Sequence, residues 1–166
     1  MKKLILFFLA VLLMAACATQ NLTPEEKAAK RQAKKEEVAR LIESKHFVAP
    51  MRTMHSAMGT SKSIDFGYSV TVKGDTLISY LPYFGRAHNL SYGSDEGLNF
   101  TAAITEYRID RPRKDANRVQ LLGATKSSLY VYTFLIYDDG SVQLSVQSRD
   151  KEAVSFDGEI EAYKED

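Results

Sequence analysis

Cysteine and histidine are scarce in this 166-residue chain, which has one Cys and three His. The single cysteine, Cys17, lies near the N-terminus and has no second thiol to pair with, so the chain forms no internal disulfide. The stability of the remaining sequence must therefore come from its packed core. About 150 residues are enough for one domain that buries roughly 68–70% of the surface exposed by its unfolded chain.

The common enzyme and metal-site motifs are also lacking. His46, His55 and His88 are not spaced as a helical ligand pair, so a zinc site would need carboxylates from distant strands. There is no nucleophile elbow, phosphate-binding glycine loop, zinc-protease helix or dinucleotide fingerprint. Ser148 and Lys151 have Ser-x-x-Lys spacing, but they fall between two predicted strands, where this spacing does not place both on one helical face. The sequence therefore predicts no metal and no cofactor, identifies no catalytic residue, and favours a protein that is not an enzyme.

An excess of charge of one sign is missing as well. The formal net charge is +1. If Lys2 and Lys3 are removed with a signal peptide, 20 basic residues face 21 acidic ones. A near-neutral chain lacks the basic surface of nucleic-acid-binding proteins, so no nucleic-acid partner is expected.

What the sequence does have is a three-part N-terminal segment. Met1–Lys3 is cationic, Leu4–Met14 is apolar, and Ala15-Ala16-Cys17 follows, similar to the lipobox of bacterial lipoproteins. The apolar run is shorter than the about 20 residues that cross a bilayer, but it fits a signal-peptide core. The alternative is an uncleaved anchor or a buried core helix.

We therefore expect residues 1–16 to be a signal peptide and residues 17–22 to be a tether lipidated at Cys17. The membrane would then be a partner through this lipid, because several acyl chains make anchoring stable. Ala18 after the cysteine favours the outer membrane, with the protein facing the periplasm.

Residues 23–45 predict one N-terminal helix. Thr23 fits the N-cap, Pro24 the first helical position and Glu26 the acidic position of a capping box. Good helix formers follow, with an apolar stripe of Val38, Leu41 and Ile42 near the end. We expect the helix to dock by its last two turns.

Residues 46–166 form the predicted β-domain, with the period of two that is typical of strands. Strands are predicted at residues 64–72, 76–81, 98–104, 118–122, 129–137 and 142–147, followed by a hairpin with Asp157-Gly158 at its turn. The fold class expected is mainly β: an antiparallel meander of about seven to eight strands that closes as a small barrel or a sandwich.

The sequence also predicts the turns between these strands and the most buried strand. Tight turns are expected at residues 73–75 and 138–140, and polar turns containing Pro112 and Gly123 should bound the strand at 118–122. Residues 129–137 are apolar or aromatic on both faces, which predicts the most central strand.

The segment Tyr80–His88 stands out chemically. It places three aromatic residues, a proline, a glycine and an arginine together where a strand is expected to end. Tyr and Arg are the residue types that carry binding energy at interfaces. The candidate residues for binding a ligand or partner are Tyr80, Tyr83, Phe84, Arg86 and His88. The alternative is an aromatic plug that closes one end of the sheet, with Arg86 stacked on a tyrosine.

This segment also carries a family resemblance. Together with Asp75–Leu77, Gly97–Phe100 and Phe156–Ile160, it resembles the domain-of-unknown-function family 4251, small lipoproteins or secreted proteins of Gram-negative bacteria. The resemblance spans roughly residues 40–163, with His88 where tyrosine is frequent. It implies a compartment and a fold, and it brings no activity, catalytic residue or cofactor.

Three functions are compatible with these features. The leading interpretation is a non-enzymatic, lipid-anchored binding module for a small ligand or an envelope protein, acting near Tyr80–His88. The second is a structural or assembly component of the cell envelope. The third, less favoured, is an envelope hydrolase whose acidic or tyrosine residues are distant in sequence.

Overall fold

The computed structural model describes residues 23–56, 59–83, 97–126, 128–149 and 151–164. The chain divides into two compact units, Met1–Gln32 and Ala33–Asp166. The described part of the first unit is the beginning of helix α2 (Pro24–Ser44). The predicted capping box is confirmed there: the Thr23 N–H donates to the Glu26 carboxylate at 2.8 Å, and the Glu26 N–H donates to Thr23 Oγ1 at 3.2 Å.

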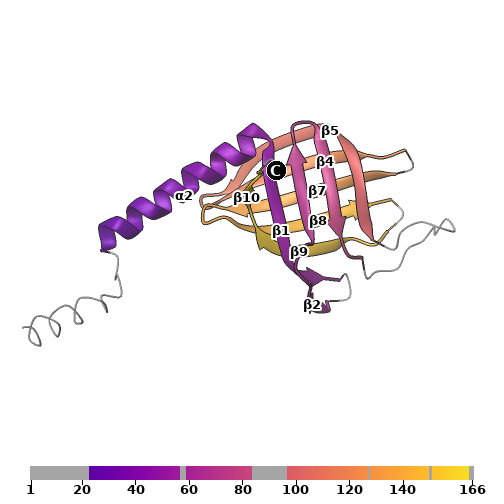
Figure 1. Ribbon diagram of the computed structural model, residues 1–166, viewed down its shortest axis with the longest axis horizontal. Coiled ribbons are helices and arrows are strands. Elements are labelled where there is room, and N and C mark those ends of the chain that lie inside the picture. Colours follow the sequence, from indigo (N-terminus) through magenta and orange to yellow (C-terminus); the bar gives the residue numbers. More distant parts are fainter. Residues whose placement is uncertain (1–22, 57–58, 84–96, 127, 150, 165–166) are drawn as a thin grey trace, which may run out of the picture. The chain divides into compact units, whose positions relative to one another are not determined.

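The second unit contains an antiparallel barrel of eight strands with two short additional strands (Figure 1). The barrel order is β1-β3-β4-β5-β6-β7-β8-β9, and β9 pairs back with β1. The strands are β1 (His46–His55), β2 (Ser61–Ser63), β3 (Ser69–Lys73), β4 (Thr76–Leu81), β5 (Leu98–Arg113), β6 (Ala116–Ala124), β7 (Leu129–Tyr137), β8 (Ser141–Ser148), β9 (Val154–Glu159) and β10 (Glu161–Ala162). Of the two expected closures, the barrel is the one formed, because the first and last strands of the order pair with each other.

Strand β1, which the sequence pattern did not reveal, closes the barrel because it pairs along both edges. Its first half pairs with β3 and its second half with β9, with a bulge between Met51 and Thr53. Pro50 lies beside this bulge, a position that tolerates the missing N–H. A Cβ at Gly158 of β9 would lie 2.1 Å from the Pro50 carbonyl oxygen. Glycine is therefore required where the two backbones meet.

Side chains fill the barrel interior. The largest of them are Tyr132, Phe47, Phe134 and Phe156, all fully buried. Phe47 and Phe134 pack edge to face with ring centroids 5.8 Å apart. The buried Tyr132 hydroxyl donates to Ser79 Oγ at 2.8 Å, which satisfies the polar groups of this pair inside the core.

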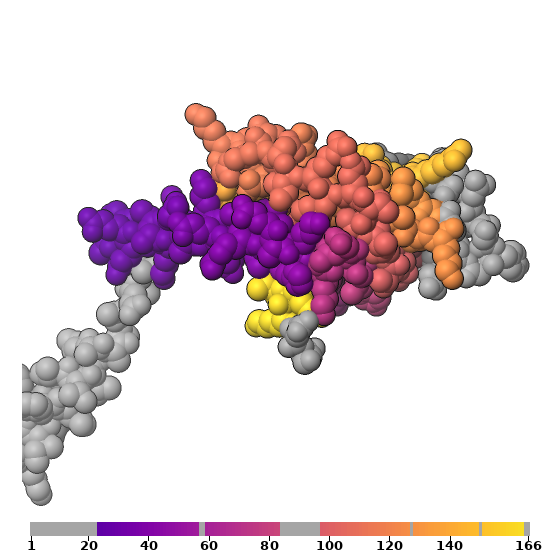
Figure 2. All heavy atoms as spheres, turned by 90° about the horizontal axis from the view of Figure 1, so that it is seen from above, coloured from indigo at the N-terminus to yellow at the C-terminus, as the bar shows by residue number. Residues whose placement is uncertain are grey.

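The last turns of α2 pack against one end of the barrel, as the apolar stripe predicts. Val38 and Ile42 are buried in the same apolar cluster as the inward-facing strand residues. The Tyr107 hydroxyl of β5 donates to the Ile42 carbonyl oxygen at 2.8 Å. Figure 2 shows the violet atoms of these turns against the salmon atoms of β5.

The two tight turns are confirmed, but the turns predicted at Pro112 and Gly123 are wrong. Strand β5 continues through Pro112, because its pairing with β6 is irregular between Asp110 and Arg113 and needs no proline N–H there. Gly123 lies within β6, where a Cβ would approach the Leu77 side chain to 2.7 Å. Pro112 therefore lies at an irregular pairing within the sheet, and Gly123 lies at a close contact across the core.

Two further strand predictions also need correction. Strand β9 runs straight through Asp157-Gly158, so no hairpin forms there; Gly158 serves the contact with β1 instead. The strand predicted from residue 64 begins only at Ser69. Residues 129–137 do form β7, but a closed barrel has no central strand.

Candidate functional site

Only part of the predicted binding segment can be placed. Cys17, Phe84, Arg86 and His88 lie outside the described residues. Of the predicted binding residues, Tyr80 and Tyr83 are described, on either side of the buried Leu81-Pro82 pair. Their environments differ.

Tyr83 packs against the connection between β8 and β9. Its hydroxyl donates to the Glu152 carbonyl oxygen at 3.4 Å, and the Lys151 ammonium lies 4.9 Å from the centre of its ring. Lys151 Nζ also donates to the Gly97 carbonyl oxygen at 2.9 Å. Burial raises the pKa of Tyr83 and lowers the pKa of Lys151. Tyr83 therefore holds the start of the β4–β5 connection against the β8–β9 connection.

Tyr80 instead lies on the outer face of β4, next to the segment that leads into β3. Its ring is 51% exposed and stacks on Tyr68 with centroids 5.2 Å apart. Ile78, two residues earlier on the same face of β4, is 39% exposed. Phe66 is 93% exposed, with the Arg52 guanidinium 5.9 Å from its ring centre. We call Phe66, Tyr68, Ile78 and Tyr80 the aromatic surface.

A second cluster, not anticipated from the sequence, joins β2, β1 and β9. The two ring nitrogens of His55 each lie 2.7 Å from a partner: Nδ1 from Ser61 Oγ and Nε2 from Asp157 Oδ2. A carboxylate oxygen accepts hydrogen bonds, so Nε2 donates to Asp157, while Nδ1 and the Ser61 hydroxyl form the second hydrogen bond. His55 and Asp157 are 102 residues apart, and no sequence spacing signals their contact.

Nucleophilic catalysis uses the same residue types, but it also needs a substrate site beside the nucleophile. The hollow next to this cluster is lined by His55 and Asp157 and not by Ser61. Ser61 lies on a three-residue strand whose side chains are all exposed. We therefore interpret the cluster as a cross-strand contact that holds β2 on β1.

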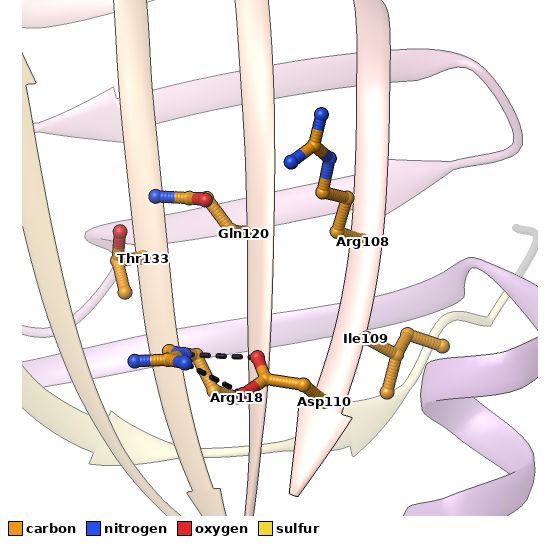
Figure 3. Close-up of a pocket in the computed structure, with 6 residues that line it drawn as sticks. All are labelled: Arg108, Ile109, Asp110, Arg118, Gln120 and Thr133. Carbon is orange, nitrogen blue, oxygen red and sulfur yellow. Dashed lines mark hydrogen bonds and ion pairs between the residues drawn. The ribbon is translucent and has the colours of Figure 1, made fainter. Parts of the chain in front are cut away.

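Two hollows that share Thr133 lie next to each other on the outer wall of the barrel. One hollow, of about 590 Å³, is lined by residues of β5, β6 and β7; the other, of about 490 Å³, extends over β8 and β9 to His55. Figure 3 shows the first hollow, with Arg118 of β6 bonded to Asp110 of β5. We call the joined hollows the outer-wall groove.

Charges at the first end of this groove are paired. Arg118 donates to both carboxylate oxygens of Asp110, at 2.8 and 2.6 Å. These hydrogen bonds hold the pKa of Asp110 below its ordinary value. Arg108 forms an ion pair with Glu106. This end therefore presents donors and acceptors with balanced charge.

The described residues contain neither a metal-binding cluster nor a helix able to span a membrane. Within these ranges, no group of three or more His, Cys, Asp or Glu side chains is placed to hold a metal ion. None of the helical turns that the structure describes combines the length and apolar composition that crossing a bilayer requires.

The comparisons with known proteins bear on the family and the fold. The family described as a domain of unknown function, DUF4251, matches residues 29–160. A crystal structure of a DUF4251 family protein from Bacteroides eggerthii DSM 20697 is similar in fold, with a TM-score of 0.62 and 8% sequence identity over 78% of this chain and 88% of that chain. A search of curated proteins returns no match. The family match covers most of the sequence, and the chain therefore belongs to the DUF4251 family.

Proposed function

We propose that this protein is a non-enzymatic, lipid-anchored component of the cell envelope that binds a partner protein through the aromatic surface. The observation that carries the proposal is the outward exposure of Phe66 and Tyr80 on a barrel whose interior is already full. A filled barrel leaves its outer wall as the place for recognition.

The shape and composition of the aromatic surface favour a protein over a small molecule. Small ligands bind in concave sites that bury most of their surface, whereas proteins bind over broad, flatter areas. Aromatic residues and arginine are enriched at the centres of protein interfaces, and Arg52 lies over Phe66. The stacked Tyr68 and Tyr80 rings add a rigid contact area with little entropy to lose on binding.

The lipid anchor in this proposal rests on the N-terminal segment. Cys17 follows a cationic start, a short apolar run and two alanines, and it is the only cysteine in the chain. Acylation there would hold the barrel beside a membrane, with helix α2 between the lipid and the barrel. The outer membrane facing the periplasm is the proposed location.

Photo-crosslinking of the full chain in its native cells tests the partner. A benzophenone amino acid at position 80 should yield a crosslink to one protein, because the ring is exposed within the aromatic surface. The same amino acid in place of Gln147, an exposed residue of β8, is the control and should yield no such product. Phe66→Ser should weaken the position-80 crosslink.

The same crosslinking experiment can contradict the proposal. Absence of a position-80 product, or the same products from positions 80 and 147, would mean that the aromatic surface is not a specific interface. A position-80 product unaffected by Phe66→Ser would exclude Phe66 from it.

A further inference from the structure

We propose that the outer-wall groove is a second binding site, separate from the aromatic surface, which takes a neutral oligosaccharide. The proposal rests on the register of the barrel strands, on the chemistry of the groove floor and on the paired charges at its end. It does not depend on the partner protein proposed above.

Strand register builds the groove floor from small polar side chains. Gln120 of β6 is directly opposite Thr133 of β7, which is opposite Ser145 of β8, which in turn is opposite Ser155 of β9. This row continues at each end, to Arg108 on β5 and to His55 on β1. Three of the side chains in this row carry hydroxyl groups. The floor therefore consists of short, polar side chains across several strands.

The hydrogen-bonding capacity of this surface matches a polyhydroxylated ligand. Hydroxyl and amide side chains both donate and accept, as sugar hydroxyls do. Arg118 is bonded to Asp110 and Arg108 to Glu106, so these charged groups add donors and acceptors without net charge. This balance favours a neutral ligand over an acidic one.

Apolar contacts and size fit the same class of ligand. Leu135, directly opposite Arg118 and Gln143 on the outer face of the sheet, lines one hollow and offers an apolar face for the C–H side of a sugar ring. The two hollows have volumes of about 590 and 490 Å³. Ligand sites generally occupy about 300–1,000 Å³, which leaves room here for several sugar units.

Other polymers fit this groove less well. An extended peptide that adds to a sheet needs free backbone groups at an edge, but β6, β7, β8 and β9 are each paired on both sides. A nucleic acid needs uncompensated positive charge, and the arginines here are paired. Neither mode of binding uses the row of hydroxyls.

The test is an NMR titration of the full chain, purified in a detergent without a sugar head group, with defined oligosaccharides. The probes are neutral tetrasaccharides of glucose, N-acetylglucosamine, mannose and galactose, with tetragalacturonate as the acidic comparison. We expect saturable binding of at least one neutral probe, with shifts at Gln120, Thr133 and Ser145. Thr133→Tyr should abolish it, because the ring would fill the point where the hollows meet.

Two further variants separate binding from folding. Gln120→Ala at an exposed position should weaken binding about tenfold while the thermal unfolding midpoint changes little. Thr101→Tyr, on the outer face of β5 away from the groove, is the size-matched control and should leave binding unchanged. Failure of every neutral probe to bind, binding that persists in Thr133→Tyr, or tighter binding of tetragalacturonate would each overturn the proposal.

Discussion

Tyr132 and Ser79 form a polar contact inside an otherwise apolar cluster of the barrel. Both side chains are buried, and the phenol donates to the serine hydroxyl at 2.8 Å. Burial raises the pKa of Tyr132 well above its ordinary value, so the phenol stays protonated and remains a donor. Each group depends on the other, because water does not reach either of them.

Removal of the second hydroxyl should therefore cost little once the first has been removed. Tyr132→Phe is expected to lower the free energy of unfolding by about 1–3 kcal/mol, since Ser79 is left buried without its donor. The double variant Tyr132→Phe/Ser79→Ala should lose less than the sum of the two single variants in urea denaturation. Additive losses would show that the two hydroxyls do not stabilise each other.

The exposed carboxyl of Asp110 is held by Arg118. Its hydrogen bonds with Arg118 depress its pKa, so Arg118→Gln should raise that pKa towards the ordinary aspartate value. With a depressed folded pKa, the contribution to stability is present above the unfolded pKa and disappears as pH falls through the folded pKa. An NMR titration of the carboxyl carbon measures the change. Arg108→Gln is the control, and an equal effect of both variants would exclude a specific Arg118 contact.

Among the elements, β1 and β9 decide whether the barrel closes. The strands meet at a bulge, where Pro50 and Gly158 bring two backbones into close contact. A bulge bends the strand that carries it and increases its local twist, which helps a sheet to turn onto itself. The seam therefore needs a residue without a side chain, Gly158, where the two backbones touch.

Gly158→Ala should be strongly destabilising for this reason. The added Cβ would lie 2.1 Å from the Pro50 carbonyl oxygen, so one of the strands must move. We expect a loss of about 3 kcal/mol or more in the free energy of unfolding, measured by urea denaturation. Ser155→Ala, an outward-facing change in the same strand, should stay within about 0.5 kcal/mol. Similar losses for the two variants would argue against a tight seam.

For the whole molecule, the filled barrel separates stability from recognition. The interior side chains are committed to the core, whereas Ile78 and Tyr80 of the aromatic surface and the outer-wall groove lie on the outside of the sheet. Substitutions on the outside can therefore change binding with little effect on folding. The proposed lipid anchor acts on a third part of the chain, before helix α2.

Cys17→Ser tests this anchor in the full protein. We expect the variant to lose incorporation of labelled fatty acid and to move from the membrane fraction to the soluble fraction, because its hydroxyl does not replace the acylated sulfur. Ala18→Ser is the neighbouring control and should remain with the membrane. Unchanged labelling and fractionation of Cys17→Ser would refute the anchor.

Features that depend only on neighbouring residues could be predicted from the sequence. The capping box at Thr23 and Glu26, the strand at 76–81 and the turns at Gly74 and Gly140 all follow from local hydrogen bonding or backbone conformation. The buried stripe of Val38 and Ile42 follows from helical periodicity. The sequence also marked Tyr80 as a candidate binding residue, although the side chains beside it were not foreseen.

The contacts between distant residues became visible only in the folded barrel. The tertiary structure chose the barrel over the sandwich by pairing β1 with β9, and it turned Gly158 from an expected hairpin residue into the contact point of that seam. It left Phe66 exposed where alternation predicted a half-buried strand, and it brought His55 to Asp157 across 102 residues. The physical reason is that strand register joins segments far apart in the chain, and local residue patterns contain no record of which segments will be neighbours.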